Sequence, residues 1–250
     1  HGDLFMVGAF FCFLVATILK LPFVPTLLLS MIGVALIGVM IERVAYKPLR
    51  AAPRVSAVIT ALGVGLFLEN FTLVFFPYPQ SVPQLLNTIT WEIGGVTISS
   101  LQILITFLSI GLMVLLDLIV RRTMVGMAMR AISWDKTIVP LMGVPLNLII
   151  SITFAIGTSL GAAAGTMYAM AFPVIDPYMG IIIGWKAFIS AVVGGIGNVR
   201  GAMIGGFILG GVEIMVAAFL PSTYRDFVAF ALLLVLLIFR PYGILGKPRP

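Results

Sequence analysis

Three ionisable residues stand inside long apolar stretches of this sequence: Glu69, Lys186 and Glu213. A charge within hydrocarbon is costly, so each is a candidate functional residue by default. Lys186 lies thirteen residues before Val199 and Glu213 fourteen after it, so an antiparallel helical hairpin would bring both to one depth. Glu69 reaches a similar depth along its own helix. The spacing predicts that Lys186 pairs with one of these carboxylates, either as a structural salt bridge or as part of a polar ring along a substrate path.

Residues for catalysis or metal binding are missing or badly placed. Gly157-Thr158-Ser159-Leu160-Gly161 fits the G-x-S-x-G pattern of serine hydrolases, but that motif needs a strand–turn–helix setting and a histidine base. The sole histidine, His1, excludes a histidine-built metal site, and the sole cysteine, Cys12, excludes an internal disulfide. We therefore expect no catalytic residue and no metal. Glycines four residues apart instead predict close helix packing: Gly157, Gly161 and Gly165, then Gly201, Gly205, Gly206 and Gly210.

A further glycine cluster, Gly194, Gly195 and Gly197, separates two apolar stretches. A phosphate-binding loop would end in Gly-Lys-Ser/Thr, and this cluster does not. Two interpretations stay open. The cluster is either a tight turn in which glycine tolerates positive φ, or a flexible or re-entrant element that lines a path.

The elements that hold these residues are long enough to cross a bilayer. The chain is 61% hydrophobic and 10% charged, against about 25% charged residues in soluble domains. Unbroken apolar stretches of about 20 residues predict helices, because barrel strands are about ten residues long and alternate. The sequence therefore predicts an all-α, polytopic transmembrane helical bundle of about eight spanning segments: Leu4–Leu19, Pro22–Ile41, Val55–Phe76, Leu101–Val120, Leu148–Phe172, Ile181–Gly197, Ala202–Leu220 and Phe227–Phe239.

Lysine and arginine are distributed unevenly between the links. Twelve of the fifteen fall on alternate links or after the last segment: Arg43, Lys47, Arg50, Arg54, Arg121, Arg122, Arg130, Lys136, Arg200, Arg240, Lys247 and Arg249. The positive-inside rule then predicts that these links and the C-terminus are cytoplasmic. The net charge of +6 forms no patch on a globular face, so we expect a lipid bilayer as partner and no nucleic acid.

Two links are long enough to have structure of their own. In the outer link Phe76–Ser100, apolar residues alternate around Gly94-Gly95, which predicts a small β-hairpin. Ser99 and Ser100 then offer an N-cap to the following helix. In the inner link, Met129–Gly143 predicts a short amphipathic helix at the membrane surface, where a soluble partner could push on the bundle.

Seven stretches spread along the chain form a series: His1–Asp3, Glu42–Arg50, Asp176–Gly180, Gly184–Phe188, Gly194–Gly197, Gly201–Gly206 and Arg240–Gly246. In this order they resemble the motifs of the permease subunits of branched-chain amino acid ABC transporters, the LivH-type family of bacterial inner membranes. His1-Gly2-Asp3 resembles only the end of a family motif. We therefore expect at least one more span before His1.

The resemblance implies a single permease domain over residues 1–250 that works with other subunits. These are a second, related permease subunit, two ATP-binding subunits and an extracytoplasmic substrate-binding protein. ATP would be bound and hydrolysed on the partners, so no cofactor is expected in this chain. The resemblance also implies that the inner link is a coupling helix that docks on the ATPase, through Arg130, Ala131, Asp135 and Gly143. Pro140 departs from the family pattern, and the helix is expected to end before it or begin at it.

The implied function is ATP-driven import of a branched-chain or related small amino acid by alternating access in the bacterial plasma membrane. The binding protein would choose the substrate and dock on the outer links. The same physical features allow an alternative, an ion-coupled secondary transporter or channel, which would act without ATPase subunits. A membrane-embedded enzyme is disfavoured, because the sequence has no catalytic constellation.

Overall fold

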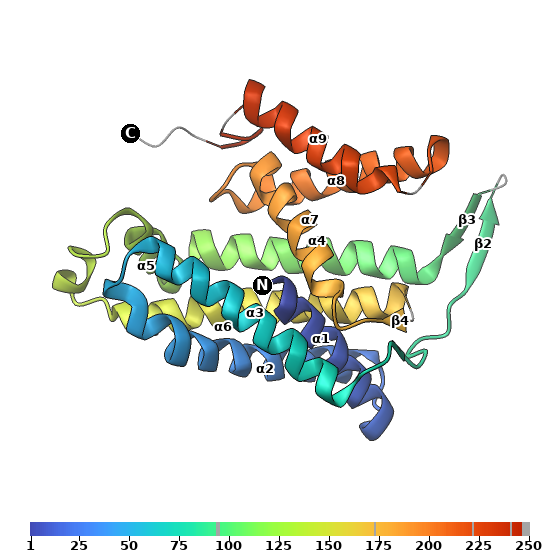
Figure 1. Cartoon of the computed structure of the whole chain (residues 1–250), viewed down its shortest axis with the longest axis horizontal. Coiled ribbons are helices and arrows are strands. Elements are labelled where there is room, and N and C mark those ends of the chain that lie inside the picture. The colour runs from blue at the N-terminus through green and yellow to red at the C-terminus, as the bar shows by residue number, and fades with distance from the viewer. Residues whose placement is uncertain (94–95, 173, 222, 241, 247–250) are drawn as a thin grey trace. The chain divides into compact units, whose positions relative to one another are not determined.

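A computed structural model describes residues 1–93, 96–172, 174–221, 223–240 and 242–246 (Figure 1). Over these ranges the chain is mostly helical, with a few short strands. The α-helices are α1 Gly2–Leu14, α2 Phe23–Ile41, α3 Arg54–Phe75, α4 Ser100–Arg122, α5 Met124–Trp134, α6 Leu146–Ala171, α7 Met179–Gly194, α8 Val199–Phe219 and α9 Tyr224–Phe239. π-Helical stretches, Val15–Leu19 and Glu42–Tyr46, follow α1 and α2, and 3-10 stretches cover Lys47–Ala51 and Val139–Met142. The strands are β1 Gln80–Ser81, β2 Thr90–Ile93, β3 Val96–Ser99 and β4 Val174–Ile175.

The helical membrane architecture expected from the sequence is confirmed, with one correction to the number of spans. In the described part of the chain, six helices are long and apolar enough to cross a membrane: Gly2–Leu19, Phe23–Arg50, Val55–Phe75, Ser100–Arg122, Leu146–Ala171 and Val199–Phe219. The other two expected segments correspond to α7 and α9, each of 16 residues. At 1.5 Å per residue such helices are about 24 Å long, less than the ~30 Å hydrocarbon core. The prediction of eight full spans was therefore too high.

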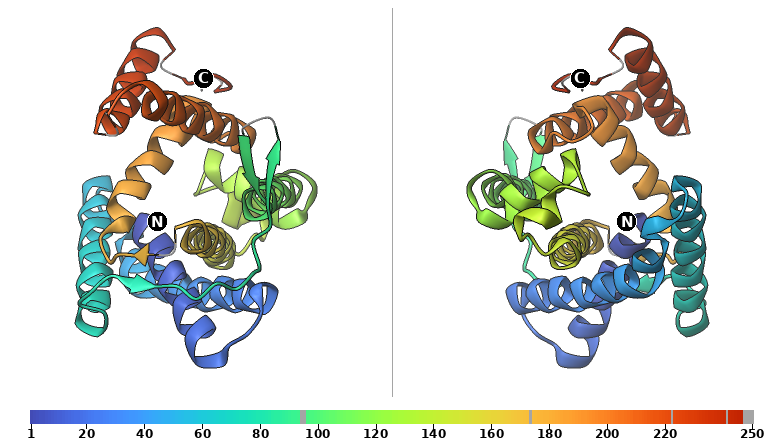
Figure 2. Two further views of the ribbon diagram at one scale, coloured as in Figure 1. Left: turned by 90° about the vertical axis from the view of Figure 1, so that its right-hand side faces the viewer. Right: turned by 90° about the vertical axis from the view of Figure 1, so that its left-hand side faces the viewer.

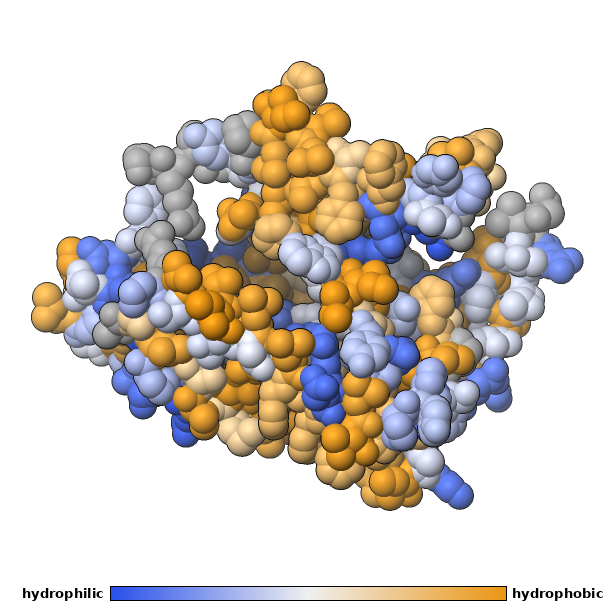
Figure 3. Space-filling view, viewed as in Figure 1, coloured by the Kyte–Doolittle hydropathy of each residue, from blue (hydrophilic) through white to orange (hydrophobic). Residues whose placement is uncertain are grey.

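Apolar side chains are exposed along the spanning helices. On α3, Leu62 is 66% exposed and Phe67 is 63% exposed, and on α2 Leu36 is 68% exposed. Figure 3 shows hydrophobic side chains gathered over much of one face of the molecule. In water such a surface would be unfavourable, whereas lipid chains match it.

One compact unit comprises residues 1–112 and 118–181, and its centre is the contact of α1, α2 and α6. Val34 and Ala162 are fully buried there. The backbones of α1 and α6 meet at glycines: a Cβ added at Gly165 would lie 2.1 Å from the carbonyl oxygen of Phe5, and one added at Gly8 would lie 2.5 Å from Cα of Ala162. The predicted packing role therefore holds for Gly165.

Two other glycines of the predicted α6 series do not make such close contacts. A Cβ at Gly157 or Gly161 would have no neighbour nearer than 3.8 Å or 3.9 Å, respectively, which is ordinary van der Waals distance. The four-residue spacing therefore overstated how many glycines the packing requires. One residue in this series, Gly165, is the point of closest approach to α1.

The predicted β-hairpin is present in the first unit. β2 and β3 pair antiparallel, with Trp91 opposite Ile98 and Thr90 opposite Ser99, and the hairpin leads directly into α4 (Figures 1 and 2). Its expected Gly94-Gly95 turn lies outside the described residues. Ser99 caps α4 as predicted: its hydroxyl accepts from the amide of Leu101, and its own amide donates to Gln102 Oε1 at 3.2 Å. β1 and β4 form a second antiparallel pair that the sequence did not predict.

The second compact unit comprises residues 113–117 and 182–250 and contains most of α7 with α8 and α9. Ile189, Leu209 and Ala229 are buried together at its centre, one from each helix. α7 and α8 approach closely at Gly205, where a Cβ would lie 2.1 Å from the carbonyl oxygen of Ser190. A Cβ added at Gly210, by contrast, would have no neighbour within 4 Å. Only some glycines of the predicted α8 series are therefore needed for close helix packing.

The inner link differs from its prediction. A single helix over Met129–Gly143 was expected, but α5 ends at Trp134 and a separate 3-10 turn covers Val139–Met142. The Thr123 side chain caps the start of α5, which places the helix start five residues earlier than predicted. Pro140 sits at the beginning of the 3-10 turn, where the missing amide is tolerated, and Gly143 ends it with φ +80°.

Candidate functional site

Lys186 of α7 forms ion pairs with carboxylates from two other helices. Its Nζ lies 3.0 Å from Glu213 Oε1 on α8 and 3.2 Å from Asp226 Oδ1 in the first turn of α9. The predicted pairing of Lys186 with Glu213 is thus present. Asp226 was missed because the last predicted segment begins at Phe227, one residue later, whereas α9 begins at Tyr224. Acidic residues favour the first turn of a helix, which is where Asp226 lies. We call Lys186, Glu213 and Asp226 the Lys186 trio.

The Lys186 trio is only partly enclosed. The side chains of Lys186, Glu213 and Asp226 are 28%, 21% and 59% exposed. Glu213 Oε1 is buried and, apart from the ion pair with Lys186, has no hydrogen-bond partner in the described structure. Two carboxylates face one ammonium group, so the trio has a formal charge of −1. It therefore offers an unbalanced and partly accessible charge within apolar helices.

Glu69, the third predicted residue, has a different neighbour. It lies on α3, is 4% exposed, and interacts with the carboxyl group of Asp3 at the start of α1. Asp3 also contacts α3 at Gly65, where a Cβ would lie 2.5 Å from Asp3 Oδ2. Glu69 is therefore part of a contact between two carboxyl groups in the first unit.

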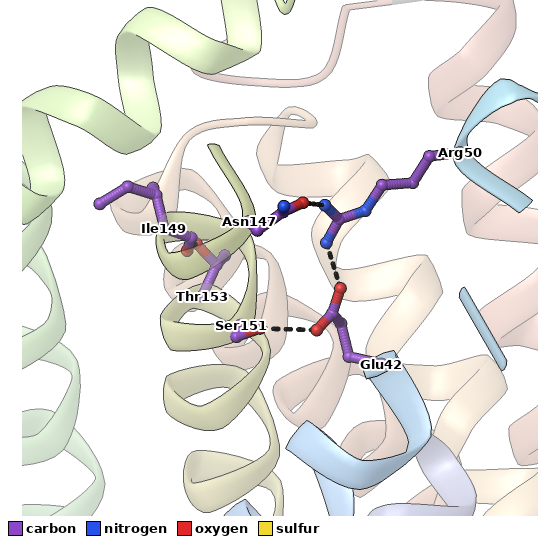
Figure 4. A network of polar contacts seen from close by, with 6 residues as sticks. All are labelled: Glu42, Arg50, Asn147, Ile149, Ser151 and Thr153. Atoms are coloured by element: carbon purple, nitrogen blue, oxygen red, sulfur yellow. Dashed lines mark hydrogen bonds and ion pairs between the residues drawn. The ribbon is translucent and has the colours of Figure 1, made fainter. Parts of the chain in front are cut away.

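A second polar cluster joins three elements of the first unit (Figure 4). Glu42, at the end of α2, is fully buried and forms an ion pair with Arg50 of the following 3-10 stretch. Its other oxygen accepts a 2.6 Å hydrogen bond from the Ser151 hydroxyl of α6, and Arg50 also donates to Asn147 Oδ1. We call these four residues the Glu42 cluster. Both oxygens of the buried carboxylate are occupied.

The sequence did not predict the Glu42 cluster, although Glu42 and Arg50 were part of a family motif. Residues eight positions apart do not face each other closely in a continuous α-helix. The π-helical and 3-10 stretches after Ile41 change the direction of the chain and return Arg50 toward Glu42. That local change of helix type left no clear signal in the residue pattern.

The residues predicted to couple to an ATPase lie in and after α5, and each has a local structural contact. Arg130 donates to the carbonyl oxygen of Val120, and Ala131 packs against the apolar cluster of Ile132, Val139 and Ile149. Ile149 belongs to α6, so this cluster connects the inner link to a spanning helix. Gly143 ends the 3-10 turn and its amide donates to the carbonyl oxygen of Pro140 at 3.0 Å, while a Cβ added there would have no neighbour within 4 Å.

Asp135 shapes the turn that follows α5. Its Oδ1 accepts hydrogen bonds from the Thr137 hydroxyl at 2.5 Å, the Thr137 amide at 2.7 Å and the Ile138 amide at 3.2 Å. These donors hold the pKa of the Asp135 carboxyl below its ordinary value, the Thr137 hydroxyl having the largest effect. Asp135 therefore fixes the backbone between α5 and the 3-10 turn.

Four large apolar side chains in the same link are exposed, and none of them was among the predicted site residues. They are Met124, Trp134, Leu141 and Met142, which are 80%, 77%, 86% and 78% exposed. They lie in α5 and the 3-10 turn, outside the spans. An exposed apolar group of this kind is typical of a protein contact surface.

The predicted glycine cluster between α7 and α8 is a tight turn that receives a later part of the chain. Gly195 and Gly197 have φ +109° and +90°. The amides of Ile244 and Leu245 donate to the carbonyl oxygens of Val193 and Gly194 at 2.9 Å and 3.1 Å. A Cβ at Gly195 would lie 2.5 Å from the amide nitrogen of Gly246. Glycine is therefore needed both for the turn and for the approach of the segment Tyr242–Gly246.

Arg200 follows this turn and is bound to α4. Its Nη2 and Nε lie 2.8 Å and 3.1 Å from the same oxygen of Asp117. Among the described residues, no group of three or more His, Cys, Asp or Glu side chains is arranged to hold a metal ion.

Comparison with known proteins places these features in a family. Residues 1–237 match the family described as branched-chain amino acid transport system / permease component. The chain is 40% identical to the high-affinity branched-chain amino acid transport system permease protein BraD of Pseudomonas aeruginosa, over 100% of this chain and 85% of that protein. It is 37% identical to LivH of Escherichia coli, with the same coverage of both chains.

A more distant relative comes from an archaeon. The chain is 25% identical, over 98% of its length and 82% of the relative, to a probable branched-chain amino acid transport permease protein LivH of Methanocaldococcus jannaschii. No solved structure matches the chain significantly. From its full-length similarity to these proteins and its match over residues 1–237, the chain belongs to the permease-component family of branched-chain amino acid transport systems.

Proposed function

We propose that this chain is the membrane-embedded permease subunit of an ATP-driven importer for branched-chain amino acids in a bacterial inner membrane. The observation that carries the proposal is the 40% identity to a high-affinity branched-chain amino acid permease over the whole chain. The apolar spanning helices support it, because a permease must place its path inside a bilayer.

The proposal includes partners. A second, related permease completes the path, two ATP-binding subunits hydrolyse ATP, and an extracytoplasmic binding protein delivers the substrate. No cofactor binds this chain. The link that holds α5 and the C-terminal segment face the cytoplasm, in keeping with the many lysines and arginines there. The β2–β3 hairpin then faces the binding protein.

The contact with the ATP-binding subunit is made by α5 and the 3-10 turn. Trp134, Leu141 and Met142 present an apolar surface for a cleft in the partner. Beneath that surface, Ile132 and Val139 pack against Ile149 of α6. Closure of the partner would therefore press on a packed cluster, and the force would reach a spanning helix. Arg130 and Asp135 act as positioning residues that hold this link in shape.

The test is transport by the purified permease in proteoliposomes, with and without its partners. With ATP-binding subunits and binding protein present, leucine uptake should require ATP on the side of the membrane where the ATP-binding subunits lie. Uptake should stop when a non-hydrolysable analogue replaces ATP. The permease alone should show no uptake. Uptake by the permease alone under an ion gradient would instead establish the secondary-transporter alternative.

The proposed coupling surface has a matched control within the chain. Trp134→Ala removes a 77% exposed indole from the end of α5, whereas Trp91→Ala removes a 46% exposed indole from the hairpin. Trp134→Ala should weaken the binding of ATP-binding subunits at least tenfold, and Trp91→Ala should leave it unchanged. Equal binding by both variants would contradict the assignment of the surface.

A further inference from the structure

The Lys186 trio has more negative than positive charge, and this imbalance favours a ligand that carries an ammonium group. Lys186 lies 3.0 Å from Glu213 and 3.2 Å from Asp226, so one ammonium serves two carboxylates. Charged groups within a membrane span pair with one another or mark a substrate path. A purely structural pair would need only one of the two carboxylates.

The trio also has unused hydrogen-bonding capacity of both kinds. An ammonium group has three donors, and each carboxylate accepts up to about four hydrogen bonds. Two donors of Lys186 are directed at carboxylates, and Glu213 Oε1 accepts no hydrogen bond beyond the ion pair within the described structure. A ligand that has both an ammonium and a carboxylate group would donate to the free acceptors of Glu213 and Asp226 and accept from the remaining donor of Lys186.

An exposed aromatic group lies beside these charges. Phe230 follows Asp226 by one helical turn on the same face of α9, and its ring centroid is 6.5 Å from that of Trp185, which precedes Lys186. Phe188 stacks edge-on against Trp185 at 6.3 Å. The three rings are 43–55% exposed. Charges next to an accessible apolar surface match an amphiphile with an ionic head and a short apolar side chain.

We propose that the Lys186 trio is a binding site for the zwitterionic head of an amino acid, whose apolar side chain lies on Trp185 and Phe230. Glu213 and Asp226 receive the α-ammonium group and Lys186 receives the α-carboxylate. This inference rests on the proposed import of amino acids and names the groups that recognise the substrate. Binding exchanges ion pairs within the trio for ion pairs with the ligand, so each charge of the ligand faces an opposite charge of the trio, and the net charge of −1 is unchanged.

The experiment measures ATP-dependent leucine uptake by the complete transporter in proteoliposomes, together with its ATPase activity stimulated by binding protein. Glu213→Gln and Lys186→Met should each lower leucine uptake at least tenfold, and ATPase activity should stay within twofold, which shows that the complex is assembled. Lys186→Arg should retain part of the uptake because it keeps the charge. Lys20→Met, a lysine outside the trio, is the matched control and should transport like the wild type.

A charge exchange separates a binding site from a structural salt bridge. Lys186→Glu combined with Glu213→Lys preserves one ion pair but reverses its charges relative to Trp185 and Phe230, and Asp226→Asn is added so that the new carboxylate faces no like charge. A substrate site predicts that uptake stays at least tenfold reduced in this triple variant. Recovery of half or more of wild-type uptake would show that the trio is only structural and would overturn the inference.

Two further outcomes distinguish this inference from the proposed function. If wild-type transporter imports leucine and Glu213→Gln imports it equally well, the substrate site is wrong and the importer assignment stands. If the wild type with all partners imports no branched-chain amino acid, the proposed function itself fails. Phe230→Ala adds a specificity measurement: the KM for leucine should rise at least threefold more than the KM for alanine.

Discussion

The Glu42 cluster and the Lys186 trio are two charged groups in the same chain, and they are built in opposite ways. Glu42 is fully buried, and its two oxygens are occupied by Arg50 and Ser151. In the Lys186 trio, by contrast, one cation serves two partly exposed carboxylates, and one buried oxygen accepts no hydrogen bond from the described residues beyond an ion pair. The first group is closed and balanced, and the second is open and unbalanced.

The difference indicates what each group is for. A buried ion pair with all its hydrogen bonds made resists change, because removing one partner leaves the other charge alone in an apolar place. A group with spare acceptors and an excess charge gains by binding a ligand. The Glu42 cluster therefore holds the ends of α2 and α6 together, and the Lys186 trio is the group for which we propose a ligand.

Removal of Arg50 should have the largest effect on stability. Arg50→Ala leaves the buried Glu42 carboxylate without its cation, which costs about 3–5 kcal/mol. Thermal unfolding of the purified permease in detergent should show a correspondingly large loss of Tm. The double variant Glu42→Gln/Arg50→Ala should recover part of it, because the uncompensated charge is gone. Equal Tm for Arg50→Ala and wild type would show that the Glu42 carboxylate does not depend on its ion pair with Arg50.

Removal of the Ser151 hydroxyl tests the second oxygen of Glu42. Ser151→Ala leaves that oxygen buried without a donor, which costs about 1–3 kcal/mol. Ser159 on the same helix donates only to the backbone of Ile156, so Ser159→Ala is the matched control. A larger loss of Tm for Ser151→Ala than for Ser159→Ala is expected in the same unfolding assay.

The Lys186 trio should tolerate loss of its cation better than the Glu42 cluster does. Lys186→Met is expected to cost about 1–2 kcal/mol, between the ranges for exposed and buried ion pairs, because the carboxylates remain partly exposed. Asp226→Asn should change Tm less still, since Asp226 is 59% exposed. If Lys186→Met lowered Tm as much as Arg50→Ala, the two charged groups would not differ in how much the fold depends on them.

Asp135 is a different case, because its carboxylate accepts three hydrogen bonds although the residue is only partly buried. Its pKa is lowered in the folded protein, so its stabilisation is present above the ordinary carboxyl pKa and is lost as the pH falls through the lowered value. The protection of the Thr137 and Ile138 amides against hydrogen exchange, measured relative to their intrinsic exchange rates, should fall at acid pH without global unfolding. Asp135→Ala should show low protection of these amides at every pH, and equal protection in the variant and wild type near pH 7 would contradict the turn.

The sequence predicted the apolar helices, the hairpin and the pairing of Lys186 with Glu213, because these depend on hydropathy, turn residues and regular helix spacing, but it predicted two spans too many. Asp226 and the Glu42 cluster were missed for a different reason. They depend on where α9 begins and on the π and 3-10 stretches that return Arg50 toward Glu42. Such local departures from a regular helix are not visible in residue periodicity.

The inner link shows the same limit. Amphipathic character predicted a helix there, but its ends are set by single side chains, the Thr123 cap and the Asp135 turn. The glycine series of α6 and α8 were recognisable by spacing. Which glycines make contact depends on the neighbouring backbone, and Gly165 and Gly205 are two that do.

The bonds from Ile244 and Leu245 to the turn after α7 also set an order for biosynthesis. These residues are translated about fifty positions after the turn, a delay of about 3–10 s at 5–20 residues per second. Until then the carbonyl groups of Val193 and Gly194 lack these partners. The turn is therefore completed only after α8 and α9 have been made, and a nascent chain interrupted before residue 242 leaves it unfinished.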